Sequence, residues 1–186
     1  MHSFIASVWL VALLLLQGCV PPSLIAKRTP ENIAVMLASL DKTIPRSEAK
    51  RLAQDLYYAT YRLNEAFLRT TSPKVHNFLV NIGVKEKGLC YHYSDALYRH
   101  VVNGDYPHFS FHLAGANIGS YWREHNALVV TAKGKPVEEG LIIDAWRDPE
   151  GLYVVAFNKD PDYHWLHRPK RGCCQKSLLS RTKASL

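Results

Sequence analysis

The chain is poor in cysteine, with four in 186 residues, and two of the four, Cys173 and Cys174, are adjacent. A bond between neighbouring cysteines closes a strained small ring, so such pairs are rarely structural staples. No two cysteines stand at Cys-x-x-Cys spacing, a common signature of a structural zinc site. We therefore expect a domain held together by its hydrophobic core, without a disulfide framework, a metal site or a cofactor.

Acidic residues are absent after Asp162, whereas six lysines and arginines follow it. The end of the chain therefore carries six of the seven excess positive charges, and the rest is nearly neutral. A basic end favours anionic surfaces such as lipid head groups, although most such ends are only solvated. The rest of the chain has no basic stripe with interleaved aromatic residues, so specific nucleic-acid binding is not predicted. We expect residues 168–186 to form a flexible tail.

The apolar run from Phe4 to Leu16 has thirteen residues, too few to cross a bilayer as a helix, and is typical of a secretory signal peptide. It ends in Leu16-Gln17-Gly18-Cys19, which resembles the lipobox of bacterial lipoproteins. The resemblance implies cleavage before Cys19 and acylation of its thiol. Two features depart from the pattern: residues 1–3 lack Lys or Arg, and Gln17 replaces a small residue. A plain signal peptide with an incidental Cys19 therefore stays an alternative.

The residues after Cys19 suit a tether. Val20-Pro21-Pro22-Ser23 makes a stiff spacer without regular structure. Val20 is not the aspartate associated with retention at the inner membrane, so the resemblance implies an outer-membrane anchor facing the periplasm. We expect a signal peptide over residues 1–18, a lipidated tether over 19–28 and a single domain over 29–167.

Helical signals fill the first half of this domain. Thr29-Pro30-Glu31 opens a helix with a hydroxyl cap, a proline and an acidic residue in the first turn. One stripe of apolar residues predicts a longer helix from about Ser47 to Leu68. Ser72-Pro73 opens a third helix through Leu79, and Cys90 begins a fourth that stops at Asn103-Gly104.

Strand signals follow Pro107. Phe109, Phe111 and Leu113 alternate with polar residues, as in a half-buried strand. Three further strands are predicted at residues 127–130, 141–146 and 152–157. Helices followed by strands predict an α+β domain, with the helices packed on one face of an antiparallel sheet.

Three residues of reactive type fall at the ends of these elements. Cys90 lies where a loop becomes a helix, and there free N–H groups and the helix dipole stabilise a thiolate and a developing oxyanion. His125 begins a strand and could take the thiol proton, and Asp144, 19 residues later, could orient the imidazole. Alone, a cysteine at a helix start is usually a small buried side chain, and an aspartate before a turn is usually a cap. Their order and their element types together predict a catalytic triad.

The residues around these positions carry a family resemblance. The run from Gly88 to Leu97 has a glycine two residues before Cys90, an aromatic residue just after it and a small residue further along. Glu124–Val130 reads as a strand that begins beside the histidine, and Ile142–Trp146 as a strand with the aspartate and a following tryptophan. Together they resemble the transglutaminase-like cysteine protease superfamily.

This resemblance covers about residues 83–146 and implies a papain-like fold. It implies Cys90 as the nucleophile, His125 as the base and Asp144 as the orienting acid. His92 lies two residues from Cys90 along the helix and so points away from it, which makes it a poor base. The sequence does not identify a side chain that would complete an oxyanion hole.

Aromatic residues near the triad are candidates for the walls of a substrate cleft. They are Trp122, Trp146 and Tyr91, with Tyr121 beside them in the sequence. Packing in the core or on a sheet face is at least as common a use of such residues.

These features predict an envelope-anchored cysteine hydrolase or acyl transferase that acts on amide bonds of a peptide or protein through a thioester. Water as the acceptor would give a peptidase or amidase, and a lysine amine would give a transglutaminase. Two alternatives stay open because a fold does not guarantee chemistry. One is a catalytically silent module that binds a peptide or a partner, and the other is a structural lipoprotein whose basic tail contacts anionic envelope polymers.

Overall fold

The computed structural model describes residues 29–69, 72–120, 122–148 and 151–169. Cys19, Tyr121, Cys173 and Cys174 lie outside these ranges, as do the predicted signal peptide and most of the predicted tail. No helix within the described ranges is long and apolar enough to span a membrane.

Four helices come first in the described chain, close to where the sequence predicts them. Thr29 caps the first one, with its side chain accepting a hydrogen bond from the Asn32 N–H at 3.4 Å. The second ends at Ala66, just short of the predicted Leu68, because Leu68 adopts a positive φ of 48°. The helices are α2 (Pro30–Ala38), α3 (Arg46–Ala66), α4 (Pro73–Asn81) and α5 (Cys90–Val102).

An antiparallel sheet of five strands follows, in the order β4-β3-β2-β1-β5. The predicted strand at residues 141–146 ends early, at Asp144. Its carboxylate accepts the backbone N–H groups of Trp146 and Arg147, which turns the chain out of the sheet. The shortest strand has no counterpart in the sequence prediction. The strands are β1 (Phe109–Ala116), β2 (His125–Ala132), β3 (Leu141–Asp144), β4 (Tyr153–Ala156) and β5 (Leu166–His167).

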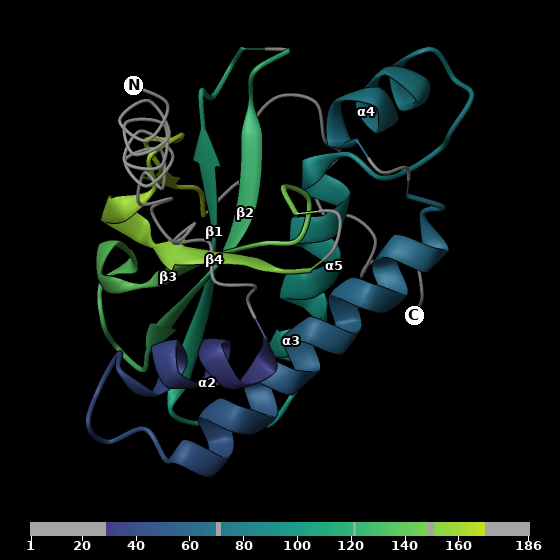
Figure 1. Ribbon diagram of the computed structural model, residues 1–186. Helices are drawn as coiled ribbons and strands as arrows, with labels where there is room; N and C mark the ends of the chain where they lie inside the picture. Colours follow the sequence, from purple (N-terminus) through teal and green to yellow (C-terminus); the bar gives the residue numbers. More distant parts are fainter. Residues whose placement is uncertain (1–28, 70–71, 121, 149–150, 170–186) are drawn as a thin grey trace, which may run out of the picture.

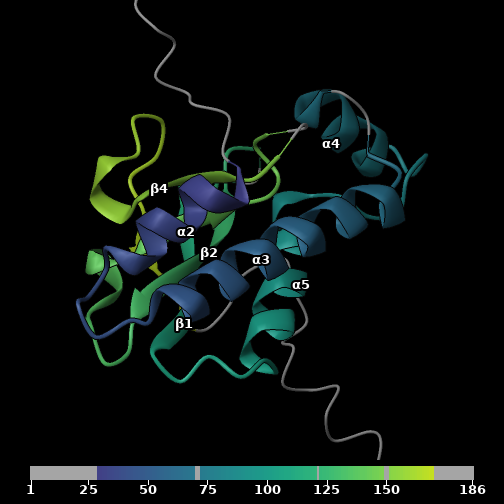
Figure 2. The same ribbon diagram turned by 60° about the horizontal axis from the view of Figure 1, so that its bottom comes forward.

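The predicted α+β class is therefore confirmed. Helices α2, α3 and α5 cover one face of the sheet (Figures 1 and 2) and bury Leu97 against Leu128 and Ile143 in the main core. The opposite face carries a smaller core, in which Phe157 and Trp165 from the C-terminal segment cover the strands. Helix α4 lies apart from α2 in both views, at the end of the molecule where α5 begins.

Substitution of Leu97 tests this arrangement of the core. Leu97 is fully buried, whereas Val102 on the same helix is 44% exposed. Leu97→Ala leaves a cavity and should lower the free energy of unfolding by about 2–5 kcal/mol, measured by urea denaturation. The matched control Val102→Ala should change it by less than about 1 kcal/mol. Equal unfolding midpoints for the two variants would contradict the packing described here.

Candidate active site

Cys90, His125 and Asp144 meet at the end of the sheet beside α5. Cys90 is the first residue of α5, His125 the first of β2 and Asp144 the last of β3. The Nε2 atom of His125 lies 2.6 Å from Oδ2 of Asp144, and Cys90 is close enough to add to the raised pKa of the imidazole. The Cys90 thiol itself donates to the Glu124 carbonyl oxygen at 3.8 Å. All three side chains are buried. The structure thus brings together the three residues that the sequence predicts as a triad, through two neighbouring strands and one helix start.

The buried carboxylate controls the protonation of the imidazole. Burial by itself disfavours the imidazolium, but the charge of Asp144 and its hydrogen bond outweigh burial, with Cys90 adding to them, and raise the pKa of His125 to about 10. Burial also disfavours the charged form of Asp144, yet His125 and Arg147 hold the pKa of that carboxyl below its usual range. The pair is therefore an imidazolium and a carboxylate at neutral pH.

Arg147 supports the carboxylate from the other side. Its Nε donates to Oδ2 of Asp144 at 3.2 Å, the same oxygen that faces His125. Its guanidinium also forms two hydrogen bonds to Asp160, at 3.0 and 2.7 Å. The tight turn after β3 therefore fixes the orientation of Asp144 and joins it to the C-terminal segment.

Aromatic rings enclose the imidazole. The ring centroids of Trp146, Tyr163 and Trp165 lie 4.9, 4.6 and 5.5 Å from that of His125. The Trp165 indole donates to Asp160 at 2.8 Å, which anchors this shell to the partner of Arg147. Low-polarity surroundings strengthen the interaction between His125 and Asp144, because water cannot compete for it.

Gly88 allows the close packing beneath the Cys90 loop. Its φ of +114° lies in the region that favours glycine, and a Cβ there would stand 2.0 Å from Nε2 of His76. His76 is buried, and this nitrogen lies 2.8 Å from the Lys87 carbonyl oxygen. The glycine that contributes to the family resemblance thus has a steric reason in this chain.

His92 caps the start of α5. Its Nδ1 accepts the backbone N–H groups of Gly88 and Leu89, at 3.1 and 3.2 Å. This interaction fixes the loop that leads into the helix. The N–H of Cys90 stands at the first helical position, where no intrahelical carbonyl can accept it.

A polar network behind Cys90 has no local signal in the sequence. Asn126 points its Nδ2 at Sγ of Cys90, 3.9 Å away, and Arg168 donates to Oδ1 of Asn126 at 3.0 Å. Arg168 also pairs with Glu124 at 2.5 Å, and its backbone N–H bonds the Leu113 carbonyl. The sequence predicts a tail from Arg168 onward, but the structure buries this side chain in the domain, because both of its polar partners lie beside the start of β2.

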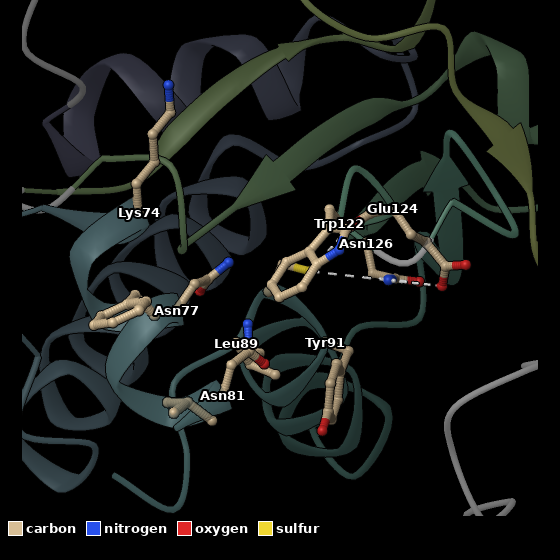
Figure 3. Close-up of a pocket in the computed structure, with 11 residues that line it drawn as sticks. Lys74, Asn77, Asn81, Leu89, Tyr91, Trp122, Glu124 and Asn126 are labelled. Carbon is tan, nitrogen blue, oxygen red and sulfur yellow. Dashed lines mark hydrogen bonds between the residues drawn. The ribbon is translucent and has the colours of Figure 1, made fainter. Parts of the chain in front are cut away.

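A cavity of about 620 Å³ opens over Cys90 between α4 and the segment before β2 (Figure 3). Trp122 and Tyr91 line it, as the sequence predicts for cleft residues, whereas Trp146 is not among the lining residues and packs on His125 instead. Trp122 is 77% exposed, so a ligand in the cavity could contact it. The residues that line it are Lys74, Asn77, Phe78, Val80, Asn81, Leu89, Cys90, Tyr91, Trp122, Glu124 and Asn126.

Metal-ligand clusters are absent from the described ranges, in which no group of three or more His, Cys, Asp or Glu side chains could hold an ion. His108 and His112 stand four residues apart but have different partners. Nδ1 of His108 lies 2.6 Å from Oε2 of Glu48, and Nε2 of His112 lies 3.4 Å from the hydroxyl oxygen of Thr131.

Comparison with known proteins assigns no family: no protein-family model matches the chain, and neither the curated proteins nor the solved structures contain a significant match.

The raised pKa of His125 can be measured directly by NMR of nitrogen-15-labelled histidine. At pH 8, the ring nitrogens of His125 should have the chemical shifts of an imidazolium, because its pKa is raised to about 10. Asp144→Asn should bring that pKa down toward its ordinary range. His112 is an internal control, because burial and His167 lower its pKa. A neutral His125 at pH 8 in the unaltered protein would contradict the ion pair.

The same ion pair should make stability depend on pH. Folding raises the pKa of His125, so the stabilisation is complete below the unfolded value of 6.5 and is lost as the pH rises through about 10. The difference in unfolding free energy between the unaltered protein and Asp144→Asn should therefore shrink across this interval, as followed by urea denaturation. A constant difference would show that the pair does not titrate in this way.

Proposed function

We propose that this protein is a cysteine hydrolase or acyl transferase acting on amide bonds of a peptide or protein substrate. The observation that carries the proposal is the position of His125, which pairs with the Asp144 carboxylate at 2.6 Å and lies close enough to Cys90 for the cysteine to raise the pKa of the imidazole. A nucleophile in contact with a base, which a third group orients, is the arrangement that activates a thiol for acyl transfer. The cavity over Cys90 gives a substrate access to the sulfur.

The reaction would use the two nitrogens of His125 differently. Because Nε2 faces Asp144, Nδ1 is the nitrogen left to exchange a proton with Cys90. The thiolate would attack the substrate carbonyl carbon, and the imidazolium would return the proton to the departing amine. The resulting thioester would be released to water, which gives hydrolysis, or to a second amine, which gives transfer. Asp144 would stabilise the imidazolium throughout without accepting its proton.

The transglutaminase-like resemblance belongs to this proposal. It rests on the motifs around Cys90, His125 and Asp144 and on the order of the elements that carry them, namely a helix that begins at the nucleophile and two paired strands with base and acid. Trp146 adds support, because it follows the aspartate by two residues and shields the His125–Asp144 contact.

Alkylation of Cys90 by iodoacetamide tests the proposed thiol activation. In full-length protein with Cys19, Cys173 and Cys174 replaced by serine, Cys90 is the only thiol. Iodoacetamide reacts with the thiolate, and at pH 6 an ordinary thiol is almost entirely protonated. If His125 stabilises the Cys90 thiolate, Cys90 should be alkylated at least about tenfold faster than in the same protein with His125→Ala. Asn103→Ala, just after the far end of α5, is the control and should leave the rate unchanged. A slow reaction that does not depend on His125 would favour a silent binding module instead.

Anchoring in the cell envelope is also proposed, on the strength of Leu16-Gln17-Gly18-Cys19. Thr29, where the described structure starts, follows Cys19 by ten residues, so the chain between them reaches at most about 35 Å. The domain would then work close to the membrane surface and act on substrates in the envelope.

Metabolic labelling tests this anchor. Cells that express the chain with an alkyne-tagged fatty acid should label it, and Cys19→Ser should abolish the label and release the protein from the membrane fraction. Cys173→Ser is the matched control and should keep both. Labelling that persists without Cys19 would contradict the lipobox assignment.

A further inference from the structure

Asn77 lines the same cavity as Cys90 but comes from a different element, α4. Figure 3 shows its amide nitrogen pointing into the cavity, away from the helix. No sequence motif marks this residue, and the chemistry proposed for Cys90 so far gives it no role. Asn77 and Cys90 nonetheless border the same space, which a substrate bound over the sulfur would occupy.

The orientation of the Asn77 amide follows from its partner. Oδ1 of Asn77 accepts a hydrogen bond from Nε1 of Trp146 at 3.1 Å. An indole N–H can only donate, so the oxygen end of the amide must face Trp146 and the NH₂ end must face away from it. Within the described ranges, no residue accepts a hydrogen bond from this NH₂ group. Asn77 therefore presents two unused donors to the cavity.

Trp146 is itself held firmly. Its ring packs on His125, its backbone N–H bonds Asp144, and its carbonyl accepts from Arg69, which also donates to the Ala145 carbonyl. The indole thus ties the amide of Asn77 to the same framework that orients the base. A donor fixed before the substrate arrives needs no reorganisation when charge develops, which is what makes such donors effective.

Asn126, whose amide is in contact with Cys90, is committed to other partners. Its Nδ2 faces Sγ of Cys90 at 3.9 Å and Oε1 of Glu124 at 3.5 Å, and its Oδ1 accepts from Arg168. This amide is arranged to face the sulfur itself. Among the residues that the structure describes, none competes in this way for the NH₂ group of Asn77, which makes it the better donor for a second negatively charged atom.

We propose that Asn77 supplies the side-chain half of an oxyanion hole, with the N–H of Cys90 at the start of α5 as the other half. The assignment rests on the proposed function. When the Cys90 thiolate adds to a carbonyl carbon, the C=O electron pair moves onto the oxygen, and these two donors receive the resulting charge. Collapse of the intermediate restores the C=O bond, expels the leaving group and leaves an S-acyl cysteine.

Two reagents distinguish the proposed role of Asn77 in stabilising an oxyanion from the activation of the Cys90 thiol. p-Nitrophenyl acetate acylates a thiolate through a tetrahedral oxyanion and expels p-nitrophenolate, whereas iodoacetamide alkylates it by displacing iodide at a saturated carbon, with no oxyanion. Both rates are measured on full-length protein in which Cys90 is the only thiol. Asn77→Ala should slow acylation at least about tenfold, toward the 10²–10³ range for loss of one such donor, and leave alkylation unchanged.

Val75→Ala is the matched control, because Val75 lies on the same helix, is 52% exposed and is not among the residues that line the cavity. It should change neither rate. Trp146→Phe removes the N–H that orients Asn77 and should slow acylation relative to alkylation by less than Asn77→Ala does. Retained alkylation in these variants also reports that the Cys90–His125 site is still folded.

The outcomes distinguish the two proposals. Acylation by Asn77→Ala at the unaltered rate, or an equal slowing of acylation and alkylation, would overturn the role of Asn77 and leave the triad intact as a proposal. Alkylation of the unaltered protein that does not depend on His125 would overturn the proposed function, and the oxyanion hole with it.

Discussion

The contact between His125 and Asp144 is the interaction on which the rest of the site depends. Burying an ion pair costs much of the hydration energy of both groups, so it persists only where further hydrogen bonds satisfy the charges. Here the carboxylate is satisfied by Arg147 and by two backbone N–H groups of the turn after β3. β3 ends at Asp144, and the turn that follows brings these donors to the carboxylate.

Support for this pair comes from parts of the chain that are distant in sequence. The segment after β4 contributes Asp160 to Arg147 and the rings of Tyr163 and Trp165 to the shell around His125. The same segment covers the second face of the sheet and continues to Arg168, whose side chain reaches Asn126 beside Cys90. The fold and the site are therefore stabilised by the same residues, and a site without its C-terminal segment would lose both shielding and orientation.

The features that the sequence predicts well depend on local physical chemistry. Pro30 after Thr29 and Pro73 after Ser72 open helices through their own caps, and alternating apolar residues around Phe109 indicate a strand. The predicted triad residues share this property, since each lies at the end of an element with a recognisable pattern. Their convergence in space follows once the strands pair.

The features that the sequence does not reveal depend on distant partners. Arg168 looks like part of a basic tail until Glu124 and Asn126 are seen beside it, and β5 forms only because β1 offers an open edge. Asn77 is one polar residue of an amphipathic helix until Trp146 fixes the direction of its amide. Such pairings across many residues have no periodicity to detect, so only the folded structure shows them.

The central claim, that Cys90 carries an acyl group during turnover, is tested most directly by trapping that intermediate. The single-thiol protein is mixed with an activated ester, quenched in acid and analysed by intact mass and peptide mapping. The account predicts one acyl group per chain, located on Cys90, removed by hydroxylamine and strongly reduced in His125→Ala. Acylation confined to lysines, or an unmodified Cys90 that iodoacetamide still reaches, would contradict it.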